Sequence, residues 1–381
     1  MNAVPETTTN HKQWALSLQK VQGFEALQST WLSLQAHSHC SFFTSWGWIK
    51  CWLNGLPDTI KPEVLTISLD DEIVGLAIIT RRTVTRHKVF TSRAIYMAET
   101  GDPQFDALTI EHNGLLARRG LESDVTDKAL AFLLSNSNDW DELMISGISH
   151  QIDTITTSAQ RHGLNQRVID DKYYYYIDLD ALRKNNKEFL SALSSNTRSQ
   201  VRRAIRGYET NAPLEMQIAA TLPEAFAFFD RLKELHQAYW TEKGQPGAFS
   251  STFKTTFHRR LIETLLPEQG IQLIKISAGD KEIGYLYNFV KEGEVSSYQS
   301  GFAYEANARL KPGLVSHCLA VEFNIKNGAN RYDFLAGDSQ YKGSLSTQKD
   351  NMLWLALQRN RLKFNVENKL SKLRQWMLSK R

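Results

Sequence analysis

Two eleven-residue segments of this chain match one another without a gap, and this repeat restricts the fold more than any other feature. The segments are LTISLDDEIVG, residues 65–75, and IKISAGDKEIG, residues 274–284, so they are offset by 209 residues. In both, apolar residues alternate around a polar turn, which is typical of a strand hairpin. A repeat at this domain-sized distance predicts two similar units in one chain. Chance similarity between two hairpins with Asp-rich turns is the alternative.

Helix and strand patterns alternate around both copies of the repeat. Apolar residues recur at helical spacing from Trp14 to Leu34, and a second aromatic stripe includes Trp48 and Trp52; such stripes indicate core packing rather than a cofactor box. A chain of 381 residues is also too long for one ordinary core. We therefore predict an α/β (α+β) fold with two mixed sheets flanked by helices. The units expected are residues 1–172, residues 173–360 and a basic amphipathic tail at 361–381.

Two clusters in the second half are candidates for holding an anion. Arg198, Arg202 and Arg206 are each four residues apart, which places them on one face of a helix. Such a face binds phosphate or pyrophosphate through charge-assisted contacts, and a solvated basic face is the alternative. Pro312 and Gly313 precede another helix, where free backbone N–H groups suit an anion, although Pro-Gly is also common in ordinary turns.

A third cluster combines a histidine with aromatic residues. His236 and Trp240 share one face of a predicted helix, and two glycines then open a loop that leads to Phe249. An imidazole beside an aromatic ring suits a general base or a group that orients substrate. A core histidine with its hydrogen bonds satisfied is equally consistent with the pattern.

The densest polar cluster is RYDFLAGDSQYK, residues 331–342. Asp333 lies on a predicted strand, Asp338 lies in the segment that ends this strand, and Tyr341 and Lys342 follow. Carboxylate, phenol and amine groups within twelve residues supply a base, an acid and an electrostatic stabiliser for acyl transfer. A plain strand and turn is the alternative.

Several classes of protein lose their usual signatures here. The chain has no GxGxxG, GxxxxGK[ST], GxSxG or HExxH segment, and its ten histidines and three cysteines never reach metal-ligand spacing. The net charge of +4 is too small to imply DNA as a partner. An odd number of cysteines without CxxC fits a reducing compartment, and no apolar stretch has the length of a signal peptide or membrane span. We expect a soluble, cytoplasmic protein without a metal.

Taken in order, these clusters resemble the GNAT-like acetyltransferases of the CelD/BcsL cellulose-biosynthesis type, a branch related to the FemAB peptidyltransferases. The resemblance covers about residues 173–342 and is carried by residues 198–206, His236-xxx-Trp240-xxx-Gly-xx-Gly-x-Phe249, the hairpin glycine, Pro-Gly, and Asp-Phe-xx-Gly-xxx-Tyr-Lys. It implies tandem GNAT-like (FemAB-like) subdomains. It also implies transfer of an acyl group, from acyl-CoA such as acetyl-CoA, to an amine or hydroxyl of a sugar or cell-envelope precursor in polysaccharide biosynthesis.

The resemblance also suggests a role for each cluster. Asp333 or His236 is expected as the base, with Tyr341 and Lys342 stabilising the oxyanion or the leaving group. The groups expected to contact the donor are Arg198, Arg202, Pro312 and Gly313. The groups expected to contact the acceptor are Trp240, Phe249 and Asp338.

Three alternatives stay open beside this interpretation. The loop Leu310–Val315 lacks the outer Arg/Gln and Gly/Ala of the usual GNAT pyrophosphate loop, so either it binds the donor differently or the donor is not CoA. Aminoacyl-tRNA, the donor of FemAB enzymes, is then the less favoured choice, because the charge is nearly balanced. A non-catalytic GNAT-like scaffold is the second alternative. The third is peripheral membrane contact through the tail, against simple docking of a terminal helix on its own domain.

Overall fold

Both copies of the repeat fold into antiparallel hairpins in the computed structural model, which describes residues 12–86, 88–210, 212–337 and 339–367. β2 (Glu63–Leu69) pairs with β3 (Glu72–Arg86), and β9 (Ile271–Ala278) pairs with β10 (Lys281–Lys291). The repeat therefore marks the same supersecondary unit in each half of the chain.

The two hairpins also agree in register. Ile67 lies opposite Gly75 in the first, Ile276 lies opposite Gly284 in the second, and a register shift adjoins each pair. Both isoleucines are completely buried. A shared register with a shared irregularity supports duplication over chance similarity, because neither is required of two unrelated hairpins.

Each hairpin closes through a tight turn with left-handed backbone. Asp70 (φ 49°) and Asp71 (φ 65°) form the first turn, and Gly279 (φ 57°) begins the second. A β-carbon is disfavoured in this region, so we expect Asp71→Gly to raise the free energy of unfolding by about 0.5–1 kcal/mol. Gly279→Ala should lower it by a similar amount. Thermal unfolding of both variants checks this expectation, and shifts of the same sign would contradict it.

The strand order is symmetrical about the middle of one large mixed sheet. In the described residues this sheet has thirteen strands, with β5 (Leu116–Ala117) paired beside the main path to β3. The main path runs through β1 (Trp14–Lys20), β2, β3, β4 (Phe90–Met97), β6 (Glu142–Ile148), β13 (Gln348–Gln358), β7 (Asn165–Asp178), β12 (Arg331–Ala336), β11 (Glu294–Phe302), β10, β9 and β8 (Leu214–Ile218).

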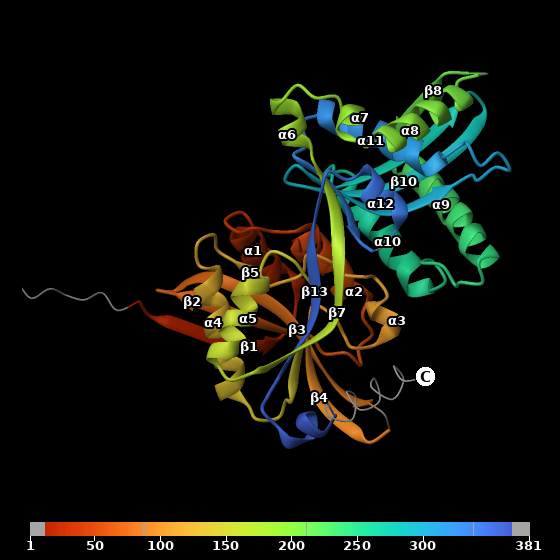
Figure 1. Ribbon diagram of the computed structural model, residues 1–381. Coiled ribbons are helices and arrows are strands. Elements are labelled where there is room, and N and C mark those ends of the chain that lie inside the picture. Colours follow the sequence, from red (N-terminus) through yellow and green to blue (C-terminus); the bar gives the residue numbers. More distant parts are fainter. Residues whose placement is uncertain (1–11, 87, 211, 338, 368–381) are drawn as a thin grey trace, which may run out of the picture.

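The halves exchange their last strands at the centre of this sheet. β7 leaves the first half and pairs with β12 of the second, and β13 returns to pair with β6 of the first. β7 and β13 also pair with each other and run side by side between the halves in Figure 1. The expected boundary between residues 172 and 173 falls inside β7. The α/β fold with flanking helices is confirmed, but one continuous sheet replaces the two sheets expected, because the exchange joins them.

Helices cover both faces of the sheet. α4 (Glu122–Asn136) and α5 (Ile152–Arg161) cover one face in the first half, and α8 (Ser195–Tyr208) and α11 (Pro312–Lys326) cover one face in the second. α2 (Trp46–Gly55) of the first half and α10 (Thr252–Leu265) of the second pack against each other. The remaining helices are α1 (Phe24–Gln35), the 3₁₀ turn Phe42–Thr44, α3 (Pro103–Asp106), α6 (Leu179–Lys184), α7 (Phe189–Ala192), α9 (Leu222–Glu242) and α12 (Gln340–Leu345).

The helix expected from Trp14 to Leu34 is wrong in its first part. Residues 14–20 form the strand β1, and the helix α1 begins only at Phe24. In β1 every second side chain turns partly inward, and the strand pairs antiparallel with β2 along its full length. The apolar residues of this segment fit the period of a strand as well as that of a helix. The segment forms a strand because it can pair with the edge of β2.

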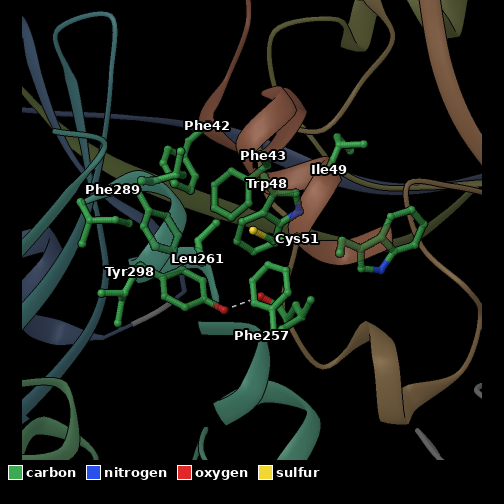
Figure 2. Packing of buried hydrophobic residues seen from close by; sticks show 14 of the residues in the cluster. Phe42, Phe43, Trp48, Ile49, Cys51, Phe257, Leu261, Phe289 and Tyr298 are labelled. Atoms are coloured by element: carbon green, nitrogen blue, oxygen red, sulfur yellow. Dashed lines mark hydrogen bonds between the residues drawn. The ribbon is translucent and has the colours of Figure 1, made fainter. Parts of the chain in front are cut away.

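An aromatic core joins the two halves where α2 meets α10. Trp48 of α2 packs 4.8 Å from the ring of Phe257 and 5.9 Å from that of Phe289, and Phe289 stacks on Tyr298 at 4.5 Å. Figure 2 shows these rings together with Phe43 around Trp48. Trp48 and Trp52 are both 2% exposed, so the prediction that this stripe belongs to the core is confirmed.

The first residues of the expected C-terminal tail pack against the first half. Phe364 is buried, and Lys363 Nζ lies 2.7 Å from the carboxylate of Asp141. The buried carboxylate of Glu367 accepts a 2.7 Å hydrogen bond from Arg86. The rest of the tail, residues 368–381, lies outside the described residues. Within the described part of the chain, no helix combines the length and the apolar character needed to cross a bilayer.

Candidate active site

A cavity of about 690 Å³ opens where two parallel strands separate. β11 and β12 pair only along Glu294–Ser296 and Arg331–Asp333, although both strands continue. Beyond that point Ser297–Phe302 and Phe334–Ala336 line the cavity. The edge of β11 that faces this space therefore has no strand partner among the described strands. Apart from the carbonyl of Ser300, which accepts a hydrogen bond from His236, its peptide groups can bind a ligand.

α9 forms one wall of the cavity and supplies His236 and Trp240. The Nδ1 atom of His236 donates to the carbonyl of Ser300 at 3.0 Å, and its Nε2 atom accepts from the N–H of Ala248 at 3.1 Å. Burial lowers the pKa of His236, so the neutral ring that fits this pair of bonds is favoured. His236 can take up a proton only by giving up the bond to Ala248. This geometry favours the alternative of a histidine with its hydrogen bonds satisfied.

The side chain of Phe249 lies behind His236 and does not line the cavity. The two rings are 5.4 Å apart, and Phe249 is buried. It therefore supports the position of His236. Trp240 is 37% exposed and faces the cavity, where an acceptor can reach it.

α12 closes the opposite side of the cavity with Tyr341 and Lys342. The ring of Tyr341 stacks on His317 at 5.3 Å, and burial raises the pKa of its phenol, which therefore keeps its proton. Lys342 Nζ donates to the carbonyl of Ala336 at 2.6 Å. The structure thus brings both residues to the site, as their spacing after β12 leads us to expect. Asp338, expected beside them, lies outside the described residues.

Asp333 lies next to the cavity but does not line it. It is 2% exposed, and its Oδ1 atom accepts a hydrogen bond from the N–H of Leu335 at 2.6 Å. Its Oδ2 atom lies 3.1 Å from Nε2 of His112, a residue of the first half. Both carboxylate oxygens therefore have partners within the protein.

Glu111, which the sequence analysis did not single out, is the one carboxylate among the described residues that lines the cavity. It comes from the loop between α3 and β5, is 5% exposed, and accepts a 2.7 Å hydrogen bond from the N–H of Ala336. Burial raises the pKa of Glu111 to about 7, although this hydrogen bond and the charge of Lys342 act in the opposite direction. A carboxylate with a pKa near 7 suits general base catalysis. In the sequence, the one pattern that could have identified Glu111 as a site residue is its place next to a histidine in a polar segment.

The two expected anion-binding clusters lie in different places. Arg198 of α8 donates to the carbonyl of Ser191 at 3.4 Å, Arg202 is exposed, and neither lines the cavity. Pro312 and Gly313 begin α11, as their sequence predicts. A β-carbon at Gly313 would lie 3.1 Å from the ring of Phe302, which does line the cavity. The start of α11 is therefore beside the site, whereas the arginines cover another face.

The first half has the same separation of strands, but there the gap between the two strands is occupied by the protein itself. β4 and β6 pair only along Ala94–Tyr96 and Glu142–Met144, which corresponds to β11 and β12. Here the loop that follows β4 fills the gap, with the N–H of Asn113 bonded to the carbonyl of Gly147 at 3.0 Å. A space of only about 10 Å³ remains beside Glu99. The segment that closes this gap is the one that sends Glu111 to the open site.

The described part of the chain contains no group of three or more His, Cys, Asp or Glu side chains arranged to hold a metal ion. The polar side chains that line the cavity include the carboxylate of Glu111, the phenol of Tyr341 and the amine of Lys342.

Comparison with known proteins supports the class of fold. Residues 195–343 match the family model described as an acetyltransferase (GNAT) domain. No curated protein matches the chain. Three similar solved structures are FemX (TM-score 0.58, 10% identity, 88% of this chain and 96% of that chain), L-PGS from Bacillus licheniformis (0.52, 12%, 87% and 92%), and a conserved protein of unknown function from Bacteroides thetaiotaomicron (0.50, 10%, 91% and 100%).

These comparisons concern one segment of the chain and the fold of the whole chain. Residues 195–343, which include α9, β11, α11 and β12, match the GNAT acetyltransferase domain family. The chain as a whole shares its fold with FemX. At 10% identity this likeness concerns the fold alone, and the reaction has to be argued from the cavity.

Proposed function

We propose that the protein is an acyltransferase that moves an acyl group from acyl-CoA to an amine or hydroxyl group. The observation that carries this proposal is the cavity between β11 and β12, where Glu111 from the first half meets Lys342 and Tyr341 from the second. β11, β12, Tyr341 and Lys342 belong to the segment that matches the GNAT acetyltransferase family, which supports the same reaction.

The shape of the site suits a donor with amide groups in an extended arm. The open edge of β11 offers peptide N–H and C=O groups to such an arm, and the pantetheine part of CoA carries two amides. The N-terminus of α11, preceded by the exposed Lys311, lies beside Phe302 and can receive the donor phosphates. We therefore retain Pro312 and Gly313 as donor-binding residues in this proposal, and we no longer assign that role to Arg198 and Arg202.

In the proposed reaction Glu111 removes a proton from the acceptor. The acceptor nitrogen or oxygen attacks the acyl carbonyl, and the resulting oxyanion is stabilised by Lys342 and by N–H groups of β11. The C–S bond then breaks, the phenol of Tyr341 stabilises the departing thiolate of CoA by donating a hydrogen bond, and solvent supplies the proton that converts the thiolate to the thiol. We assign the base role to Glu111 rather than Asp333 or His236 because only Glu111 both lines the cavity and has a pKa raised toward neutrality.

We further propose that the acceptor is a sugar or cell-envelope precursor, as the resemblance to the CelD/BcsL type implies. Trp240 and Tyr304, which is 56% exposed, line the cavity, and exposed aromatic rings suit contact with the apolar side of a sugar ring. Polysaccharide biosynthesis would be the corresponding process.

Thermal unfolding with acetyl-CoA, longer acyl-CoAs and free CoA tests the donor. A donor present at about 100 times its Kd should stabilise the protein by about 2.7 kcal/mol. Calorimetry should give one molecule per chain, because the equivalent gap in the first half is filled. Stabilisation by aminoacyl-tRNA instead of CoA esters would support the FemAB-like alternative. Absence of any stabilisation would support a non-catalytic scaffold.

A further inference from the structure

We propose that Asp333 and His112 are positioning residues that hold Glu111 in the cavity across the junction of the two halves. This inference rests on the proposed function, in which Glu111 is the base. Asp333, which the sequence analysis considered as the base, then acts on the reaction indirectly, by positioning Glu111.

The first support is a set of buried contacts that hold the imidazole ring of His112. Nε2 of His112 lies 3.1 Å from Oδ2 of Asp333, and Nδ1 lies 2.7 Å from the hydroxyl of Ser149. The side chains of His112 and Asp333 are 7% and 3% exposed. The ring of Tyr174 packs edge-on against His112 at 4.9 Å. Each polar atom of the imidazole therefore has one defined partner, and the ring has one defined orientation.

The second support is the direction of neighbouring side chains. Glu111 and His112 are adjacent in sequence, yet Glu111 lines the cavity and His112 contacts Asp333, which does not. Both contacts end on the same short segment of β12. Glu111 accepts from the N–H of Ala336, and Asp333 accepts from the N–H of Leu335. Fixing His112 on Asp333 therefore also fixes where the carboxylate of Glu111 can lie.

The third support is the backbone on either side of this contact. Thr109 (φ 53°), His112 (φ 47°) and Leu335 (φ 62°) all have left-handed conformations, and none of them is glycine. Such conformations are strained in residues other than glycine and persist only where the surrounding contacts enforce them. Asp333, bonded to both His112 and the N–H of Leu335, supplies contacts to two of the three.

Electrostatics agrees with this arrangement. Burial by itself would lower the pKa of His112, but the hydrogen bond and the charge of Asp333 raise it above its ordinary value. The negative charge of Asp333 also raises the pKa of Glu111, and the positive charge that His112 carries when protonated lowers it. Removing Asp333 should therefore change the titration of Glu111 as well as its position.

The first experiment follows Glu111 directly and needs no acceptor. Protein labelled with ¹³C at the glutamate carboxyl is titrated by NMR, and the Glu111 signal is assigned by its absence in Glu111→Gln. We expect Asp333→Asn to raise the pKa of Glu111 above about 7, because His112 then loses the contact that keeps it protonated, and its positive charge lowers the pKa of Glu111 more than the charge of Asp333 raises it. Asp350→Asn is the matched control, since this exposed carboxylate on β13 has no contact with His112 and should leave the titration unchanged.

The second experiment is a double-mutant cycle on acetyl transfer from acetyl-CoA to glucosamine, which offers an amine and several hydroxyls. Asp333→Asn should lower kcat by about 10- to 100-fold in the parent protein and by less than about twofold when Glu111 is already glutamine. His112→Ala should behave in the same way and serves if Asp333→Asn does not fold.

The two experiments separate failure of the inference from failure of the proposed function. An unchanged Glu111 titration in both Asp333→Asn and His112→Ala would overturn the positioning role. Equal losses of kcat in the two backgrounds would overturn it as well. A shifted titration together with full activity of Glu111→Gln would leave the positioning role intact and refute Glu111 as the base.

Discussion

Replacement of Glu111 by glutamine is expected to lower kcat by about 10²- to 10⁴-fold while the protein keeps its fold. The amide oxygen can still accept the hydrogen bond from Ala336 N–H, but it cannot take a proton from the acceptor. Acetyl transfer from acetyl-CoA is measured together with thermal unfolding, and the KM for the donor should change little.

Glu99→Gln is the matched control for this variant. Burial raises the pKa of Glu99 to about 8, so it is also a carboxyl with a perturbed pKa, but it lies in the filled gap of the first half and does not line the cavity. We expect its kcat to stay within about twofold of the parent value. Equal losses in the two variants would mean that glutamine in this region disturbs the fold rather than the chemistry.

The pH dependence of the parent enzyme follows from the raised pKa of Glu111. The base acts as the carboxylate, so kcat/KM should be low below pH 7, rise through a pKa of about 7 and level off above it. Glu111→Gln should lose this acidic limb along with most of its activity. A parent profile that is flat between pH 5 and 8 would argue for a different base.

Trp48→Ala is expected to lower the free energy of unfolding by about 3–5 kcal/mol. Trp48 is 2% exposed and packs on Phe257, Phe289 and Phe43, so its removal leaves a cavity in the core that joins the two halves (Figure 2). Tyr298, which lines the active-site cavity, packs in the same cluster at 6.4 Å from Trp48. Chemical denaturation measures the loss, and transfer activity should fall with it.

Trp240→Ala provides the contrasting case. Trp240 is 37% exposed at the cavity, so its truncation should cost less than about 1 kcal/mol of stability and should raise the KM for the acceptor instead. If Trp240→Ala destabilised the protein as much as Trp48→Ala, the proposed division between core and site aromatics would be incorrect.

Structural elements that are specified by residues close together in the sequence could be predicted well. The alternating residues and polar turns of the two hairpins specify β2–β3 and β9–β10 locally, and Pro312-Gly313 marks the start of α11. Tyr341 and Lys342 reach the cavity because a short turn after β12 leaves them little choice of position. Each of these predictions depends on periodicity or turn chemistry within about a dozen residues.

The sequence by itself therefore determined the repeat, the α/β character and one side of the candidate site. Only the tertiary structure decided that β7 and β13 exchange between the halves, that residues 14–20 form an edge strand, and that Glu111 lies 225 residues before its partner Ala336. The physical reason is that these features depend on contacts between distant segments, which local propensity does not encode. The same contacts turn Asp333 toward His112 and leave Glu111 facing the cavity.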